Sequence, residues 1–230
     1  MLKSNCKSIL INGIKTAVFI CVFSLLFWLT GQILSVKFPQ YIYDGIGGFY
    51  KYPDNTVETV FLGSSLMMMG VSPMELYDKY GICSYNLGSD SQPLIASYYL
   101  LCDAKRIHND TLKNVVLDVT MLIKPNSDVS FSKVVDTMPN SVNRFTAICD
   151  YYGRDIETGL LYSIPLLKYH NRWTEINKDD YHKQFTYEYT GGYYFSRDSL
   201  LSNGDLRAEF SANCFRRFLR SDCAVGAAAA

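Results

Sequence analysis

The chain has 230 residues, 48% of them hydrophobic, and its 22 basic and 22 acidic side chains give a formal net charge of zero. Zero net charge argues against a nucleic-acid partner, which usually requires a basic surface. The length allows one folded domain and a membrane anchor. The seven cysteines form no C-x-x-C pair and have no histidine at metal-ligand spacing, so no metal or other cofactor is predicted. We expect Cys83 and Cys102 to be buried thiols rather than bridges.

Residues 17–36 read AVFICVFSLLFWLTGQILSV, an uncharged run of about the length that crosses a bilayer. Residues 1–16 are expected to form the cytoplasmic N-terminus and the start of the anchor. Three lysines precede or enter the span and only Lys37 follows closely, which predicts that the rest of the chain lies outside the cell. A cleaved signal peptide is the alternative, but the run is long for one and no clear cleavage site follows. We therefore predict a single-pass type II protein of the cell membrane.

Residues 37–56 are rich in Tyr, Gly and Pro without a clear period, and we expect them to be a juxtamembrane linker. Residues 57–223 remain for the folded domain. Residues 224–230, AVGAAAA, are a low-complexity tail.

The first half of that domain alternates apolar runs with helical patterns. Runs typical of strands lie at 57–62, 82–87 and 114–119. A capping box at Ser72 and a glycine at 81 predict a helix between them, and a longer helix is expected from about 92 to 107 with Ser91 as its cap. This order predicts an α/β fold with a parallel sheet. Further helices are expected at 142–152 and at 156–170, with an interruption at Pro165, and a polar loop at 174–196.

Ligands bind at the carboxyl ends of parallel strands, so the polar turns after the three predicted strands should converge on one edge. These turns contain Ser64 and Ser65, residues 86–92 and residues 118–120. A serine on a strand-to-helix turn suits a nucleophile. The alternatives are an ordinary Gly-Ser turn, or a phosphate-binding loop, which would normally have a following Lys and more glycines.

The stretch VFLGSSLMMMGVSPMELYDKYGICSYNLGSDSQPLIASYYLL resembles the opening of membrane-anchored SGNH/GDSL hydrolase-like proteins of bacterial cell envelopes, relatives of the D-alanine-transfer proteins of teichoic acid modification. Gly63-Ser64-Ser65-Leu66 stands where the superfamily has G-D-S-L, which implies that Ser65 is the nucleophile. The second block implies that Gly88, Ser91 and Gln92 hold the oxyanion or the substrate. The resemblance covers residues 57–125, and residues 164–173 show a weaker similarity. It implies a three-layer, flavodoxin-like domain.

Two departures from the superfamily concern catalysis. Asp118-Val119-Thr120-Met121 stands where the third block has Gly-x-Asn-Asp, so the asparagine of the oxyanion hole is absent there. The superfamily's base is a histidine in a late Asp-x-x-His block, and the one such string ends at His182 in a polar stretch that is typical of a solvated loop. His170 is the other candidate base, although a substrate contact or helix packing suits it better. His108 is expected at the surface. We therefore expect an incomplete domain without its C-terminal block.

The resemblance implies a serine esterase or acyltransferase that acts on O-acyl groups of a cell-envelope glycopolymer, with a membrane-bound O-acyltransferase as a partner. The alternative is a non-catalytic, membrane-tethered binding or scaffolding module. In that case the tyrosines at 187, 189, 193 and 194 would contact sugars or a partner.

Overall fold

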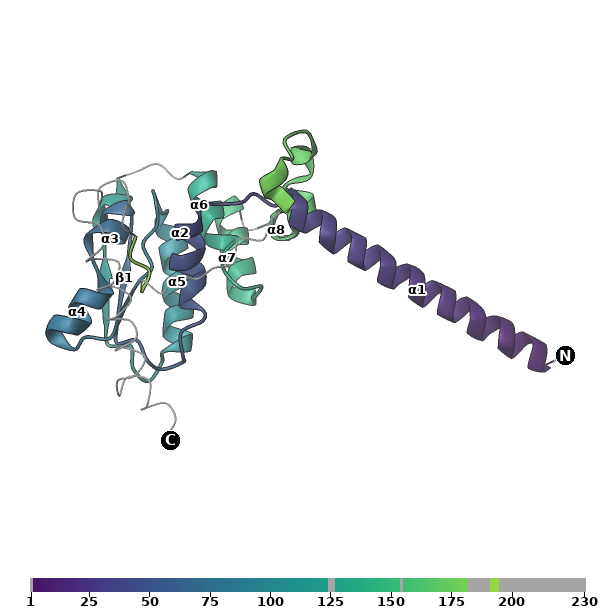
Figure 1. The fold of residues 1–230 in the computed structure, drawn as a ribbon, viewed down its shortest axis with the longest axis horizontal. Helices are drawn as coiled ribbons and strands as arrows, with labels where there is room; N and C mark the ends of the chain where they lie inside the picture. The colour runs from purple at the N-terminus through teal and green to yellow at the C-terminus, as the bar shows by residue number, and fades with distance from the viewer. Residues whose placement is uncertain (1, 124–126, 154, 182–190, 195–230) are drawn as a thin grey trace. The chain divides into compact units, whose positions relative to one another are not determined.

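The computed structural model describes residues 2–123, 127–153, 155–181 and 191–194 (Figure 1). The chain forms two compact units. We call Met1–Lys37 with Ile156–Lys183 the anchor unit, and Phe38–Asp155 with Gln184–Ala230 the sheet unit. Residues 156–183 were expected to belong to the same domain as the sheet, but they group with the N-terminal helix.

The anchor unit is built on one long helix, α1, Leu2–Leu34. Its part Ile11–Leu34 is long and apolar enough to cross a membrane, with a mean hydropathy of 2.2. The remaining elements are short: the helices α8, Ile156–Ser163, and α9, Pro165–Lys168, and the 3-10 helices η3, His170–Thr174, and η4, Lys178–Tyr181. Pro165 begins α9 and separates it from α8, which confirms the predicted interruption, because proline cannot donate a hydrogen bond inside a helix.

The sheet unit contains a three-stranded parallel sheet. Its strands β1, Thr59–Leu62, β2, Ser84–Asn86, and β3, Asn114–Leu117, lie in the order β2-β1-β3. Val60 of the central strand is opposite Tyr85 and Val115. The three strands lie within the three predicted runs, and the predicted parallel α/β arrangement is confirmed.

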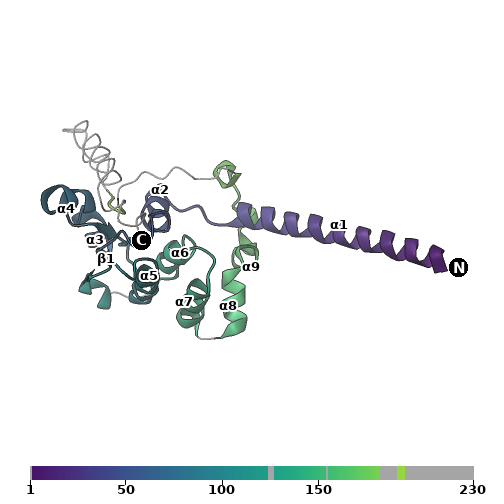
Figure 2. The ribbon, with the colours of Figure 1, turned by 90° about the horizontal axis from the view of Figure 1, so that it is seen from below.

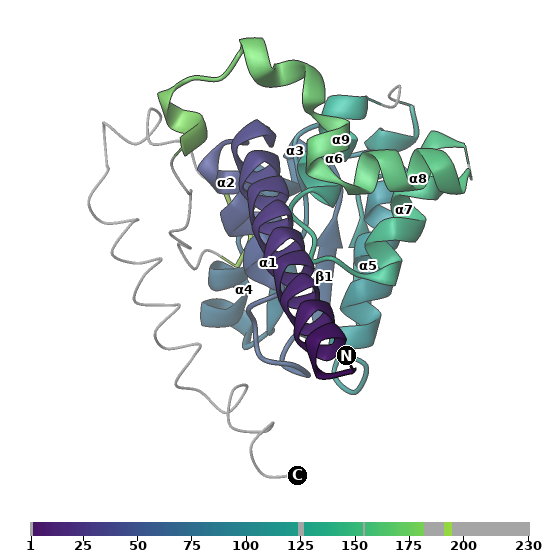
Figure 3. The same cartoon turned by 90° about the vertical axis from the view of Figure 1, so that its right-hand side faces the viewer.

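Helices connect and cover these strands. α5, Leu94–Ile107, packs against β1, and α6, Asp128–Val135, and α7, Val142–Tyr152, pack against α5 (Figures 2 and 3). The other helical elements are shorter: α2, Gln40–Ile42, η1, Tyr43–Gly47, α3, Ser65–Gly70, α4, Pro73–Tyr80, and η2, Val119–Leu122.

The predicted ends of α4 are confirmed, whereas the predicted start of α5 is wrong. Ser72 accepts a hydrogen bond from the Glu75 N–H at 3.4 Å, and Gly81 ends α4 in the left-handed conformation with φ 69°. In α5 the N-cap is Pro93, and no side chain of the described residues caps the helix. Ser91 instead has a left-handed φ of 50° within a turn that the Gln92 N–H closes on the Ser89 carbonyl.

The segment 37–56, which we expected to be a linker, contributes to the core of the sheet unit. Phe38, Ile42, Ile46, Phe49 and Tyr52 are buried. The rings of Phe49 and Tyr52 pack edge-on against Tyr85 of β2, with centroids 5.2 and 4.8 Å apart. The Tyr85 hydroxyl donates to the Gly45 carbonyl at 2.7 Å. This segment therefore covers β2 through tertiary contacts that have no sequence period.

Cys83 and His108 differ from their predicted environments. Cys83 is disulfide-bonded, so the expectation of a thiol there is wrong, whereas Cys102 is a free thiol. His108 is buried rather than at the surface. Its ring packs edge-on against Phe49 at 5.3 Å, and its Nδ1 accepts a hydrogen bond from the Thr56 N–H at 3.4 Å. Burial lowers the pKa of His108 to about 4, against the raising effect of Asp54.

Candidate functional site

The three polar turns meet at the carboxyl edge of the sheet, as their topology predicts. The backbone N–H of Ser64, after β1, donates to the Asp118 carboxylate, after β3, at 3.2 Å. The N–H of Ser89, after β2, donates to the Gly63 carbonyl at 3.0 Å. The predicted convergence is therefore confirmed by direct hydrogen bonds between the turns.

Asp118 is the acceptor at the centre of this edge. Its carboxylate accepts hydrogen bonds from the Ser64 hydroxyl, from the Thr120 N–H at 2.9 Å and from the Thr120 hydroxyl at 2.7 Å. Burial raises the pKa of Asp118, but the hydrogen bonds from Ser64 and Thr120 together lower it to about 2. Asp118 is therefore ionised at neutral pH and fixes the turn after β1.

The two serines of that turn have opposite environments. Ser64 is completely buried and is the N-cap of α3, where its Oγ accepts from the Leu66 N–H at 3.4 Å. Ser65 is the first residue of α3 and is half-buried. Within the part of the chain that the structure describes, neither its hydroxyl nor its N–H has a hydrogen-bond partner. Ser65 is thus the accessible serine of the pair.

Asn86 links the second turn to α3. Its Oδ1 accepts from the Gly88 N–H at 3.0 Å, and its Nδ2 donates to the carbonyls of Met67 and Val71 at 2.7 and 2.9 Å. A Cβ at Gly88 would lie 2.8 Å from the Met68 backbone nitrogen. The N–H of Gly88, which we expected to hold an oxyanion, is therefore used within the protein.

Gln92 and Ser91, the other two residues predicted to bind in this turn, differ in their exposure to solvent. Gln92 is buried, and its amide accepts from the Ser89 hydroxyl at 2.8 Å and donates to the Ser97 hydroxyl at 2.6 Å. Ser91 is exposed. Its neighbour Asp90 forms an ion pair with Lys133 at 2.9 Å. Gln92 therefore holds the loop, and Ser91 is the one of the three whose side chain faces solvent. Roles in binding an oxyanion or substrate stay predictions.

The two candidate bases stay predictions as well. His170 lies in the anchor unit, whereas Ser65 lies in the sheet unit. The His170 side chain is exposed, with its Nδ1 2.6 Å from the Leu167 carbonyl. His182, Tyr187, Tyr189 and the tail 224–230 lie outside the described residues.

Beside this edge, β3 is exposed on its outer side. Val115, Val116 and Leu117 are each more than 40% exposed, whereas the side chains of β1 are buried. An apolar cavity of about 470 Å³ lies between the sheet and α5, with Leu62, Leu94 and Leu117 in its wall. Within the described residues, β3 is an open sheet edge.

Sequence reasoning did not recognise Asp118 as the residue that joins the turns. The available signal was the position of an acidic side chain directly after a strand whose carboxyl end shares an edge with Ser64. We placed Asp118 in one of the converging turns and noted it as a departure from the third block of the superfamily, but we assigned it no contact with Ser64.

Comparison of the chain with protein-family models, curated proteins and solved structures found no match. The described residues define an α/β protein with a small three-stranded parallel sheet, a polar carboxyl edge, and an N-terminal helix that is able to cross a membrane.

Proposed function

We propose that this protein is a membrane-anchored serine esterase or acyltransferase with Ser65 as its nucleophile. The observation that carries the proposal is the contrast between the two adjacent serines. Asp118 holds the Ser64 hydroxyl and N–H, whereas the hydroxyl and N–H of Ser65 have no hydrogen-bond partner among the residues that the structure describes. A free hydroxyl on a strand-to-helix turn suits nucleophilic attack, and a free N–H beside it suits a developing oxyanion.

In the proposed reaction, the Ser65 Oγ attacks the carbonyl carbon of an ester while a base takes its proton. The Ser65 N–H stabilises the resulting oxyanion. The tetrahedral intermediate collapses to an acyl-enzyme, and the alcohol leaves with the proton that the base returns. Water, or a hydroxyl group of an acceptor, then releases the acyl group. His170 and His182 are the candidates for the base.

The proposed substrate is an O-acylated glycopolymer of the cell envelope, which follows from the resemblance of residues 57–125 to envelope SGNH/GDSL proteins. We further propose that α1 anchors the chain as a type II membrane protein with the sheet unit outside the cell. The apolar span and the lysines that precede it support this orientation. A membrane-bound O-acyltransferase that supplies acyl groups is the proposed partner.

Labelling by a serine-reactive fluorophosphonate tests the chemistry. We expect the full chain in membranes to be labelled and Ser65→Ala to lose the label. Ser64→Ala is the matched control, because it removes the neighbouring hydroxyl and should keep the label per amount of folded protein. Equal labelling of wild type and Ser65→Ala would show that Ser65 is not the nucleophile.

One observation favours the alternative, a non-catalytic binding or scaffolding module. The Gly88 N–H is bonded to Asn86 rather than free for a substrate. Two of the tyrosines proposed for binding, Tyr193 and Tyr194, are described, and the Tyr194 ring packs on Tyr41 at 4.4 Å. This alternative predicts that cells carrying Ser65→Ala keep the protein's function, whereas replacement of Tyr193 abolishes it.

A further inference from the structure

The C-terminal end of α1 is covered by a short segment from a distant part of the chain. Residues 156–181 contain α8, α9, η3 and η4, and all but α8 pack against α1 (Figure 2). A Cβ at Gly31 of α1 would lie 3.7 Å from the Leu166 nitrogen and 3.9 Å from the Pro165 side chain. These are ordinary van der Waals distances, so α9 packs closely on the apolar helix at Gly31.

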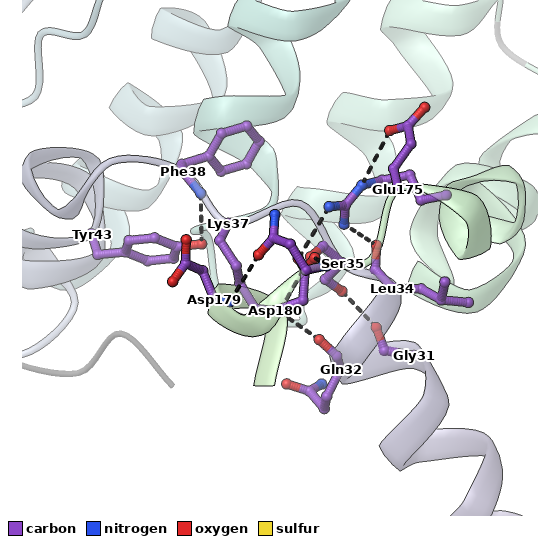
Figure 4. Close-up of polar contacts among 12 residues, drawn as sticks. Gly31, Gln32, Leu34, Ser35, Lys37, Phe38, Tyr43, Glu175, Asp179 and Asp180 are labelled. Carbon is purple, nitrogen blue, oxygen red and sulfur yellow. Dashed lines mark hydrogen bonds and ion pairs between the residues drawn. The ribbon is translucent and has the colours of Figure 1, made fainter. Parts of the chain in front are cut away.

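Two basic side chains lie at the last turn of α1, and one of them, Arg172, joins the segment to the helix (Figure 4). Arg172 donates to the Leu34 carbonyl at 2.6 Å and forms an ion pair with the buried carboxylate of Asp180 at 3.0 Å. Lys37 donates to the carbonyls of Gln32 and Ser35. These cations satisfy carbonyls that have no partner inside the helix. Burial lowers the pKa of Lys37, against the raising effect of Asp180.

The same segment exposes several apolar and aromatic side chains. Leu160, Leu161 and Leu167 are 51%, 42% and 39% exposed, and Trp173 and Tyr181 are 70% and 66% exposed. Charged side chains lie among them, the basic Lys168 and Lys178 and the acidic Glu175 and Asp179. Exposed aromatic and aliphatic groups interspersed with basic ones are typical of segments that lie in the headgroup region of a membrane.

We propose that residues 156–181 form a membrane-interface segment that lies in the lipid headgroup region where α1 leaves the bilayer, with Trp173 in contact with lipid. The inference rests on the proposed membrane span and does not depend on the chemistry of Ser65. The position of Gly31 supports it. Gly31 lies three residues before Leu34, about 4.5 Å along the helix. A segment that packs on Gly31 is therefore at the boundary of the hydrocarbon when α1 spans the membrane.

Tryptophan fluorescence of the full chain in liposomes of phosphatidylcholine and phosphatidylglycerol tests this placement. The chain has two tryptophans, so Trp28→Phe leaves Trp173 as the only one. We expect a nitroxide near the lipid glycerol to quench Trp173 more than a nitroxide deep in the acyl chain, and aqueous iodide to quench it weakly. Strong quenching by iodide without quenching by either lipid label would overturn the inference.

Trp173→Phe is the matched control, because it leaves Trp28 in the apolar part of α1. Trp28 lies six residues before Leu34, about 9 Å along the helix, and should be quenched more by the deeper label. If no lipid label quenches Trp28, the membrane span is wrong. If lipid labels quench Trp28 but not Trp173, the span holds and the proposed interface segment is wrong.

Discussion

Ser64 and Ser65 are neighbours in the chain, but their hydroxyls have different structural roles. The Ser64 hydroxyl is buried, caps α3 and donates to an ionised carboxylate. We therefore expect Ser64→Ala to lower the free energy of unfolding by about 1–3 kcal/mol, since it removes a cap and leaves a charged acceptor short of a donor. Ser65→Ala should change it by less than about 0.5 kcal/mol. Thermal unfolding of the two variants measures the difference, and equal losses would contradict the assigned roles.

The pKa of Asp118 predicts a pH dependence below pH 4. Because the folded pKa, about 2, is below the ordinary value of 3.8 for an aspartate, ionised Asp118 stabilises the fold above about pH 4. This stabilisation is lost as the pH falls toward 2. Asp118→Asn should therefore be less stable than wild type at pH 5, and the gap should narrow between pH 4 and 2. Urea unfolding at several pH values measures the gap. A gap independent of pH would show that the charge of Asp118 does not hold the turn.

His108 predicts a second pH dependence in a separate range. Its folded pKa, about 4, lies below the ordinary value of 6.5 for a histidine, so the unfolded chain binds the proton more tightly. Stability from the neutral, buried ring is present above pH 6.5 and falls as the pH decreases toward 4. His108→Phe should flatten the change in the free energy of unfolding over this range. An unchanged slope would mean that another group titrates there.

At the scale of elements, the contact between the second turn and α3 depends on Gly88. A methyl group there would lie 2.8 Å from the Met68 backbone nitrogen, so the turn or the helix must shift. We expect Gly88→Ala to cost about 1–3 kcal/mol. Gly70→Ala is the matched control at the end of α3, because no atom of the described part of the chain lies within 4 Å of its Cβ position. It should be neutral or stabilising by about 0.5–1 kcal/mol. Similar effects of both substitutions on thermal unfolding would contradict the tight contact at Gly88.

The sequence predicts the elements whose signals are local. Apolar, β-branched runs predict the three strands, and the capping box at Ser72 and the glycine at 81 predict both ends of α4. Parallel topology then predicts that the turns meet, without any knowledge of side-chain contacts. Ser64 and Ser65 could therefore be placed at one edge of the sheet from the sequence alone.

The features that the sequence does not reveal depend on tertiary contacts. Residues 38–52 have no hydrophobic period because each buried ring packs in its own tertiary environment, such as Phe49 and Tyr52 against Tyr85.

The predicted surface position of His108 was wrong. Lys105 and Arg106 indicated a surface position, but residues 96, 100, 104 and 108 form one buried i, i+4 row of α5. That row could have predicted the burial of His108.

At the scale of the whole molecule, α1 and the residues around it form a unit separate from the sheet. If α1 is a type II anchor, protease added to intact spheroplasts should digest the sheet unit and leave a tag at the N-terminus on a protected fragment. The lysines before the apolar span are the physical reason for this orientation. Digestion of the tag, with survival of the sheet unit, would show the opposite orientation.

The most direct measurement is to locate the fluorophosphonate adduct within the turn after β1. Membranes that contain the full chain would be labelled, and tandem mass spectrometry of the peptide with both serines would assign the modified residue. We predict the adduct on Ser65, because Ser64 is buried and bonded to Asp118. An adduct on Ser64, or an unmodified peptide under conditions that label a control serine esterase, would contradict it.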